Sequence, residues 1–281
     1  MNHLVVQGEN IPVPALKELA RLANAREIEK ASTRCYRLRD ADPSPASFAA
    51  IAATCASLHL DAALVPARRT LADMGLIAMD MDSTLITIEC IDEIADFCGL
   101  KNEVAAITEA SMRGEIKDFN ESLTRRVALL KGLEASALER VYDERLRLSP
   151  GAEIMLAGAK AAGLKTLLVS GGFTFFTEKL KARLGLDFTH ANTLEIVDGK
   201  LTGKVTGEIV NADVKARTLR ETCAQLGIDP QRSIAMGDGS NDLKMMAEAG
   251  LSVAFRAKPV VREAAGLALN FVGLDGLLRL F

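Results

Sequence analysis

Three segments of the sequence carry side chains whose types and spacing suit phosphoryl transfer, and the first runs from Asp80 to Thr84 as DMDST. A carboxylate such as that of Asp80 can attack phosphorus and form an aspartyl-phosphate. Asp82 stands two residues on, on the same side of an extended chain, where it can protonate the departing oxygen. The same letters are also typical of a simple turn, because Asp, Ser and Thr favour turns and helix N-caps.

The second segment, GDGSND at residues 237–242, adds the carboxylates of Asp238 and Asp242. Several carboxylates around a phosphate repel it, so a site built from both segments needs a cation. An all-oxygen ligand set that water and phosphate complete favours Mg²⁺. Taken alone, this segment is more readily explained as a glycine-rich turn into a helix that Asn241 or Asp242 caps.

The third segment is Ser170-Gly171-Gly172, whose hydroxyl and backbone N–H groups can bind phosphate oxygens at the start of a helix. A tight turn explains these three letters equally well. Lys215, on a later predicted helix, is a candidate for the positive charge that phosphoryl transfer needs, although most lysines on such a helix are solvated. The sequence has no GxxxxGK[ST] motif, which excludes a nucleotide P-loop.

Each of the three segments directly follows an apolar run that suits a buried strand. Strand-like and helix-like stretches alternate through this part of the chain, with a hairpin predicted at Asp198-Gly199 and a helix over residues 213–226. The alternation predicts an α/β fold with a doubly wound, Rossmann-like parallel sheet. Ligands bind at the carboxyl ends of such strands, so the three segments are expected to converge.

The predicted core comprises residues 75–88 and 149–281, and an inserted helical cap comprises residues 89–148. In the cap, Asp118 and Glu121 have capping-box spacing, and Ser136 with Glu139 repeats that helix-start signal. Residues 1–70 form a predicted small α+β domain. Its expected elements are a strand over 3–6, a helix over 15–23, a β-rich stretch over 31–38 and a strand over 60–65.

The composition excludes several classes of protein. A net charge of −3 leaves no basic field to hold nucleic acid or an anionic membrane. The five cysteines form no CxxC pair, which argues against a disulfide framework or a zinc site. No apolar run reaches the roughly 18 residues that a bilayer span requires. We therefore expect a cytoplasmic protein that contacts neither membrane nor nucleic acid.

The segments DMDST, SGG, Lys215 and GDGSND, in this order, resemble the motif set of the haloacid dehalogenase superfamily. Residues 76–281 also resemble the phosphoserine phosphatases within it, through segments such as FNESLTRRVALLKGL, VSGGFT and AMGDGSNDLKM. The resemblance implies hydrolysis of the small molecule L-phosphoserine to L-serine and phosphate. It further implies Mg²⁺ as cofactor, an aspartyl-phosphate intermediate, and a place as the last step of serine biosynthesis.

The resemblance also implies a role for each matching residue. Asp80 would be the nucleophile, and Asp82 the general acid and then the base. The implied metal ligands are Asp80, the Asp82 carbonyl, Asp238 and, directly or through water, Asp242. The implied phosphate-binding residues are Ser170, Gly171, Lys215 and Asn241. Glu89 would bind the substrate's ammonium group and Arg126 its carboxylate, although a one-residue slip in the match would select Arg125 instead.

Alternatives remain at this stage. The same chemistry could act on phosphohomoserine or phosphothreonine or transfer the phosphoryl group to an alcohol, or the chain could be an amino-acid-sensing regulatory protein. The acid at Asp82 favours a hydrolase. Dehalogenases have no leaving oxygen to protonate and therefore need no acid at this position. P-type pumps must keep their aspartyl-phosphate and therefore do not use an acid there either. Residues 1–70 resemble an amino-acid-binding ACT domain but show one strand too few. A homodimer is a further expectation.

Overall fold

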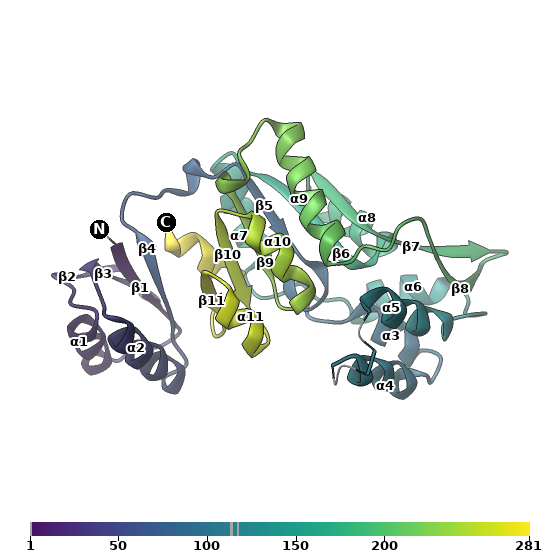
Figure 1. Cartoon of the computed structure of the whole chain (residues 1–281), viewed down its shortest axis with the longest axis horizontal. Helices are drawn as coiled ribbons and strands as arrows, with labels where there is room; N and C mark the ends of the chain where they lie inside the picture. The colour runs from purple at the N-terminus through teal and green to yellow at the C-terminus, as the bar shows by residue number, and fades with distance from the viewer. Residues whose placement is uncertain (1, 113–114, 117) are drawn as a thin grey trace. The chain divides into compact units, whose positions relative to one another are not determined.

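The computed structural model describes residues 2–112, 115–116 and 118–281, and within them the chain has an α/β fold with two separate sheets (Figure 1). By their internal contacts the residues form two compact units. One contains residues 1–77, 150–165 and 231–281, and the other contains residues 78–149 and 166–230.

The larger sheet has the strand order β11-β10-β9-β5-β6-β7-β8. The pairs β6–β7, β9–β10 and β10–β11 are parallel, and β7–β8 is antiparallel. Along the chain, strands are added on one side of β5 and then on the other, as a doubly wound sheet requires. The strands are β5 (Leu76–Met79), β6 (Lys165–Phe173), β7 (Phe188–Val197), β8 (Lys200–Thr206), β9 (Ser233–Gly237), β10 (Leu251–Phe255) and β11 (Leu267–Leu269).

Helices alternate with these strands and also form the inserted segment. The helices outside the inserted segment are α7 (Ala152–Ala161), which precedes β6, and α8 (Thr174–Leu184), α9 (Ala212–Leu226), α10 (Leu243–Glu248) and α11 (Pro259–Ala264), which follow core strands. The predicted cap range contains α3 (Cys90–Asp96), α4 (Lys101–Met112), α5 (Phe119–Ala128) and α6 (Ser136–Arg140). Residues 113, 114 and 117 of that range lie outside the described residues.

Two start signals in the cap behave differently. Asp118 caps α5, since its side chain accepts a hydrogen bond from the backbone N–H of Asn120 at 3.0 Å. A helix also begins at Ser136, as predicted, but Ser136 does not cap it. Ala135 precedes α6 in a helical conformation without a side-chain cap, because the backbone already turns at Glu134 and Ser136 is the first residue of the helix. The predicted hairpin at Asp198-Gly199 is confirmed, with a positive φ at both residues.

The smaller sheet belongs to the N-terminal domain and has the strand order β2-β3-β1-β4, with antiparallel pairing throughout. The element order is β1 (Asn2–Gln7), α1 (Val13–Leu22), β2 (Glu27–Ser32), β3 (Cys35–Ala41), α2 (Pro45–Ser57) and β4 (Asp61–Pro66). This βαββαβ order is that of a ferredoxin-like domain. Leu16 and Leu19 of α1 and Ile51 of α2 pack with Leu4 and Leu38 in one core.

The sequence prediction missed a strand in this domain. The β-rich stretch at residues 31–38 is the hairpin of β2 and β3, which the two residues Thr33 and Arg34 join. Neither residue is the glycine, asparagine or proline that usually marks such a turn, so the pattern shows one long stretch. With this hairpin included, the domain has four strands.

Asp61, at the start of β4, fastens the N-terminal domain to a distant part of the chain. Its buried carboxylate accepts hydrogen bonds from the backbone N–H groups of Asn270 at 2.8 Å, Phe271 at 2.9 Å and Val272 at 3.0 Å. Gln7 donates a further hydrogen bond to the carbonyl of Gly276 at 3.2 Å. The domain is therefore bound to the segment that follows β11 by buried polar contacts.

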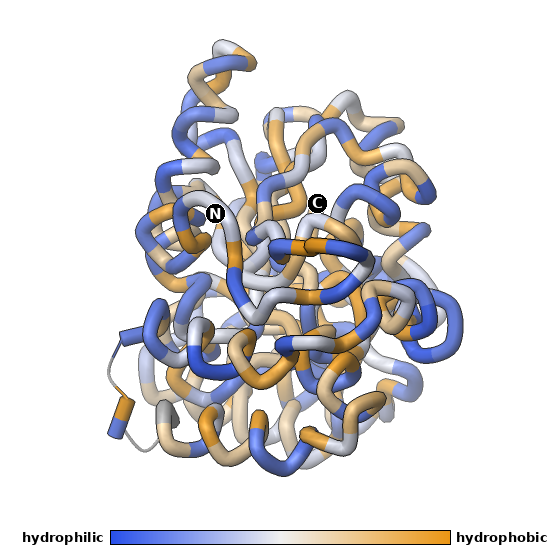
Figure 2. Tube along the Cα trace, turned by 90° about the vertical axis from the view of Figure 1, so that its right-hand side faces the viewer, coloured by the Kyte–Doolittle hydropathy of each residue, from blue (hydrophilic) through white to orange (hydrophobic). Residues whose placement is uncertain are grey.

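Hydrophobic and hydrophilic residues alternate in short stretches along the trace (Figure 2). Among the described residues, no helix combines the length and the apolar character that crossing a membrane requires.

We predict that Asp61→Ala lowers the free energy of unfolding by about 3 kcal/mol, because it leaves one buried and two partly buried N–H groups without their charged acceptor. Urea unfolding of the full chain measures this change. Asp42→Ala removes an exposed carboxylate from the same domain and should change stability by less than about 0.5 kcal/mol. Equal stability of the two variants would show that the Asp61 contact contributes nothing.

Candidate active site

Asp80 is the first residue after β5, whose four residues are all buried. The chain leaves the strand in a tight π-type turn, Met81–Leu85, and the Asp80 carboxylate accepts the backbone N–H of Met81 at 2.8 Å. Asp80 is itself buried, with 6% of its surface exposed. A carboxylate in such a place requires a partner, because desolvation without compensation is costly.

The partner is Lys215, whose ammonium nitrogen lies 2.8 Å from Oδ1 of Asp80. Lys215 has no exposed surface, so the alternative of a solvated lysine is wrong. It lies in the first turn of α9, where its N–H donates to the carbonyl of Asn211 at 2.9 Å. The Asn211 side chain caps this helix by accepting from Asp213 and Val214 at 3.0 and 3.1 Å. The cap fixes where α9 begins and hence where Lys215 points.

Asp82 is half-buried beside the same turn, where its carboxylate accepts the backbone N–H of Cys90 at 3.1 Å. Burial, with the nearby Glu89 carboxylate as the next cause, raises the pKa of Asp82 to about 7. The Cys90 hydrogen bond and the Lys215 charge oppose this rise. A carboxyl group with a pKa near 7 can hold a proton and release it at neutral pH, as a general acid and base must.

Ser170 and Gly171 lie in a bulge near the end of β6. The ladder with β7 shifts register between Val169 and Phe173, so residues 170–172 leave the regular pairing. The Ser170 hydroxyl oxygen accepts the N–H of Gly172 at 2.8 Å. A Cβ atom at Gly172 would lie 2.5 Å from Oδ2 of Asp82, so only glycine allows this close approach. The structure thus brings the SGG segment against the Asp80–Asp82 turn.

Glu89 and Arg126 come from the predicted cap range. Glu89 accepts a hydrogen bond from the Ser83 hydroxyl at 2.6 Å. Burial lowers the pKa of the Arg126 guanidinium, while the negative charges of Asp92, Glu89 and Asp82 act in the opposite direction, in that order. The guanidinium of Arg126 therefore interacts electrostatically with carboxylates of the candidate site.

Arg125 differs from Arg126 in its surroundings. Its side chain is 56% exposed and forms an ion pair with Glu121 one helical turn away, at 2.5 Å. Arg126 is partly buried and donates to the Ser122 carbonyl at 3.4 Å. Of the two arginines that the sequence left open, Arg126 is the more buried and interacts electrostatically with Asp82 and Glu89.

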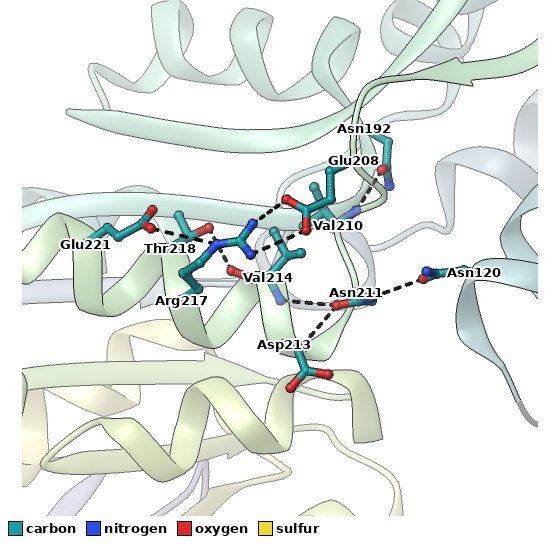
Figure 3. Close-up of polar contacts among 10 residues, drawn as sticks. All are labelled: Asn120, Asn192, Glu208, Val210, Asn211, Asp213, Val214, Arg217, Thr218 and Glu221. Atoms are coloured by element: carbon teal, nitrogen blue, oxygen red, sulfur yellow. Dashed lines mark hydrogen bonds and ion pairs between the residues drawn. The ribbon is translucent and has the colours of Figure 1, made fainter.

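Sequence reasoning missed three residues around the SGG segment. Asn192, on β7, is 1% exposed and donates to the Gly171 carbonyl at 2.7 Å. Phe119 begins α5, and the tip of its ring would lie 3.0 Å from a Cβ atom at Gly171. Asn120 follows it and accepts a hydrogen bond from Asn211 (Figure 3). An asparagine inside a strand-like run was the available signal for Asn192, because asparagine is depleted in strands.

Asp238, Asn241 and Asp242 follow β9, whose five residues are all buried. Asp242 is completely buried and its carboxylate accepts the N–H of Gly239 at 3.0 Å. The carbonyl of Asp238 accepts the N–H of Lys258 at 3.2 Å. Residues 240–242 form a single 3-10 turn before α10, as the expected turn into a helix requires.

Three of the predicted metal ligands form an acidic group in the described part of the chain. Asp80, Asp238 and Asp242 each offer one carboxylate oxygen, and these atoms lie within 4.8 Å of one another. The side chain of Asp82, for which only a carbonyl contact was expected, is not a member. A donor set of carboxylate oxygens without nitrogen or sulfur fits a hard divalent cation.

We predict that Asp82→Asn stabilises the metal-free protein more strongly at pH 8 than at pH 5. The pKa of Asp82 in the folded protein, about 7, exceeds the ordinary value of about 4. The folded state therefore holds the proton more tightly, and this contribution to stability is lost as pH rises through 7. Asparagine has no proton to lose. The melting temperatures of Asp82→Asn and the wild type in EDTA should differ by several degrees at pH 8 and by clearly less at pH 5.

Asp143→Asn, which removes an exposed carboxyl group, is the control for that measurement. A difference between Asp82→Asn and the wild type that does not grow with pH would contradict the raised pKa.

The chain is similar to known proteins in sequence and in structure. The model of the haloacid dehalogenase-like hydrolase family matches residues 77–247, and a model described as a domain of unknown function matches residues 4–46. A phosphoserine phosphatase of Polaromonas sp. (strain JS666) is 60% identical over 214 residues, which cover 75% of this chain and 91% of that relative.

Two solved structures are also similar. A probable phosphoserine phosphatase from Vibrio cholerae, in unliganded form, has a TM-score of 0.84 and 39% identity, and covers 99% of this chain and 85% of that one. A structure described as a phospho-aspartyl intermediate analogue of phosphoserine phosphatase has a TM-score of 0.69 and 40% identity, with coverage of 73% and 98%. The chain therefore belongs to the haloacid dehalogenase-like hydrolase family.

Proposed function

We propose that this hydrolase converts L-phosphoserine to L-serine and phosphate, as the last step of serine biosynthesis. The observation that carries the proposal is the environment of Asp82, which interacts with the carboxylate of Glu89 and the guanidinium of Arg126. A proton donor for the leaving oxygen thus interacts with one group suited to an ammonium and one suited to a carboxylate. The similarity to phosphoserine phosphatases over most of the chain supports the same substrate.

In the first step, a carboxylate oxygen of Asp80 attacks phosphorus and the ester P–O bond breaks. The departing serine oxygen takes the proton of Asp82 and leaves as the hydroxyl of serine. Lys215 contacts Asp80 and would compensate the negative charge of the phosphoryl group. The Ser170 hydroxyl and the Gly171 N–H would hold the phosphoryl oxygens, with Asn241 nearby.

In the second step, the deprotonated Asp82 accepts a proton from water, whose oxygen attacks the phosphorus of the aspartyl-phosphate. The bond between phosphorus and the Asp80 oxygen breaks, which releases phosphate and restores both carboxyl groups. A pKa near 7 suits both directions of proton transfer. The similarity to a phosphoserine phosphatase captured as a phospho-aspartyl intermediate analogue supports this intermediate.

Arg126 and Glu89 would select the substrate. A guanidinium binds a carboxylate through two parallel hydrogen bonds, and a carboxylate pairs with an ammonium group. Partial burial of Arg126 strengthens such a contact, because water competes less. The Ser83 hydroxyl holds Glu89 in place. Phosphohomoserine and phosphothreonine carry the same two charged groups, so the length and branching of the chain between them and the phosphate must separate these substrates.

We also propose Mg²⁺ as the cofactor. Asp80, Asp238 and Asp242 would hold it together with the Asp82 carbonyl. When bound, the cation supplies positive charge for the phosphoryl oxygens.

The domain limits remain predictions, namely an ACT-like domain over residues 1–70, a cap over 89–148 and a core over 75–88 and 149–281. A homodimer and a cytoplasmic location likewise remain predictions.

We predict that Asp80→Asn reduces phosphate release from phosphoserine by more than about a thousandfold, because an amide does not form the phosphorylated intermediate. The assay measures released phosphate in the presence of Mg²⁺, and circular dichroism confirms the fold. EDTA should abolish the activity of the wild type, and added Mg²⁺ should restore it. Robust turnover by the folded variant would exclude Asp80 as the nucleophile.

We predict that Arg126→Ala raises the KM for phosphoserine at least about tenfold, since a charged hydrogen-bond partner of the substrate is lost. The KM for p-nitrophenyl phosphate, which has no carboxylate, should change less than twofold. Arg125→Ala is the matched control on the next residue of the same helix and should leave both KM values unchanged. Equal effects of Arg126→Ala on both substrates would contradict its role as the carboxylate-binding residue.

A further inference from the structure

Two asparagines connect the candidate phosphate-binding groups to each other and to the cap range. Asn192 bridges two segments: its amide nitrogen donates to the Gly171 carbonyl at 2.7 Å, and its amide oxygen accepts the N–H of Val210 at 2.9 Å. The first contact fixes the bulge that contains Ser170. The second fixes the chain one residue before Asn211, the N-cap of the helix that carries Lys215.

Asn192 is suited to this bridge by position and burial. It pairs with Phe173 in the ladder, next to the bulge, where the Gly171 carbonyl has left the regular strand pairing. A carbonyl in such a place requires another donor. The side-chain amide is 1% exposed and satisfies both the displaced carbonyl and the Val210 N–H. No aliphatic residue could make either contact.

Asn120 connects the same segment to the cap range. Its side-chain oxygen accepts a hydrogen bond from the Asn211 amide nitrogen at 3.1 Å, while the Asn211 oxygen caps α9 (Figure 3). Asn120 lies on α5, which also carries Arg126, and its neighbour Phe119 contacts the Gly171 position. One asparagine, Asn211, therefore joins the helix of the carboxylate-binding arginine to the helix of the buried lysine.

We propose that Asn120 and Asn192 are positioning residues that act through residues 210–211. Asn192 aligns the Ser170–Gly171 bulge with Lys215, so that both reach the same phosphoryl group. Asn120 links this alignment to the placement of α5, so that binding of the substrate's carboxylate at Arg126 and of its phosphate at Lys215 support each other. The inference rests on the proposed function for the identity of the substrate, but the hydrogen bonds do not depend on it.

The full-length enzyme tests the proposal with the variants Asn120→Ala, Asn192→Ala and Asn192→Ser. Asn192→Ser retains a small polar side chain in case the alanine variant does not fold. Glu121→Ala is the matched control for Asn120, because it changes the next residue of α5, which is exposed and pairs with Arg125. The measurements are kcat/KM for phosphoserine and for p-nitrophenyl phosphate, the inhibition constant of inorganic phosphate, the melting temperature, and amide exchange of residues 212–215.

We expect Asn120→Ala to lower kcat/KM for phosphoserine about fivefold to tenfold, the usual effect of one lost hydrogen bond. Its kcat/KM for p-nitrophenyl phosphate and its melting temperature should stay within error of the Glu121→Ala values, while exchange of residues 212–215 accelerates. We expect the folded Asn192 variants to lower kcat/KM for both substrates about tenfold and to weaken phosphate inhibition, because the phosphate-binding groups themselves are misaligned.

Three results would overturn the proposal. The first is phosphate inhibition at wild-type strength in a folded Asn192 variant. The second is an equal loss on both substrates in Asn120→Ala, and the third is a phenotype indistinguishable from Glu121→Ala. If the wild type does not hydrolyse phosphoserine at all, the proposed function fails instead. The role of Asn192 is then decided by p-nitrophenyl phosphate and phosphate inhibition, and that of Asn120 by amide exchange.

Discussion

The buried ion pair of Asp80 and Lys215 is the contact on which the arrangement of the site depends. Its two atoms lie 2.8 Å apart and both side chains are almost completely inaccessible to water. Removing two charges from water is costly, and their attraction offsets that cost only when the geometry is good. The fold meets this requirement from both sides. A fully buried strand delivers Asp80 at its carboxyl end, and an asparagine cap fixes the first turn of the helix that carries Lys215. In the proposed mechanism the same pair would supply a nucleophile and the positive charge that its reaction with an anion needs.

The parts of this site that follow strand ends could be predicted from the sequence, because buried apolar runs and the residues after them form local patterns. The burial of Lys215 could not, since nothing within α9 distinguishes it from a solvated lysine. The sequence did not reveal the roles of Asn192 and Asn120 for a related reason. Their hydrogen-bond partners, Gly171 and Asn211, lie 21 and 91 residues away along the chain. Arg126 became separable from Arg125 only when the helix was seen against its neighbours. Sequence patterns report periodicity along one element, whereas these roles arise from contacts between elements.

The N-terminal domain shows the same division. Its helices and three of its strands carry clear local signals, and the missing strand was hidden by a two-residue turn without glycine, asparagine or proline. Its attachment depends on Asp61, which the sequence pattern places inside the expected strand over 60–65 without any sign of this role. In the structure this carboxylate accepts three successive backbone N–H groups more than 200 residues later in the chain. A domain held in this way is a fixed part of its compact unit rather than a module on a flexible linker.

In the proposed mechanism, the charge of Glu89 would affect both substrate recognition and proton donation. Glu89 is the proposed partner of the substrate's ammonium group, and its negative charge is also a cause of the raised pKa of Asp82. An ammonium group that pairs with Glu89 would cancel much of that charge and lower the pKa of Asp82, which makes the proton easier to transfer to the leaving oxygen. A phosphate ester without an amino group would leave Asp82 a weaker acid. Discrimination would then arise partly in the rate of the chemical step and not only in binding, because the correct substrate adjusts the acid that cleaves it.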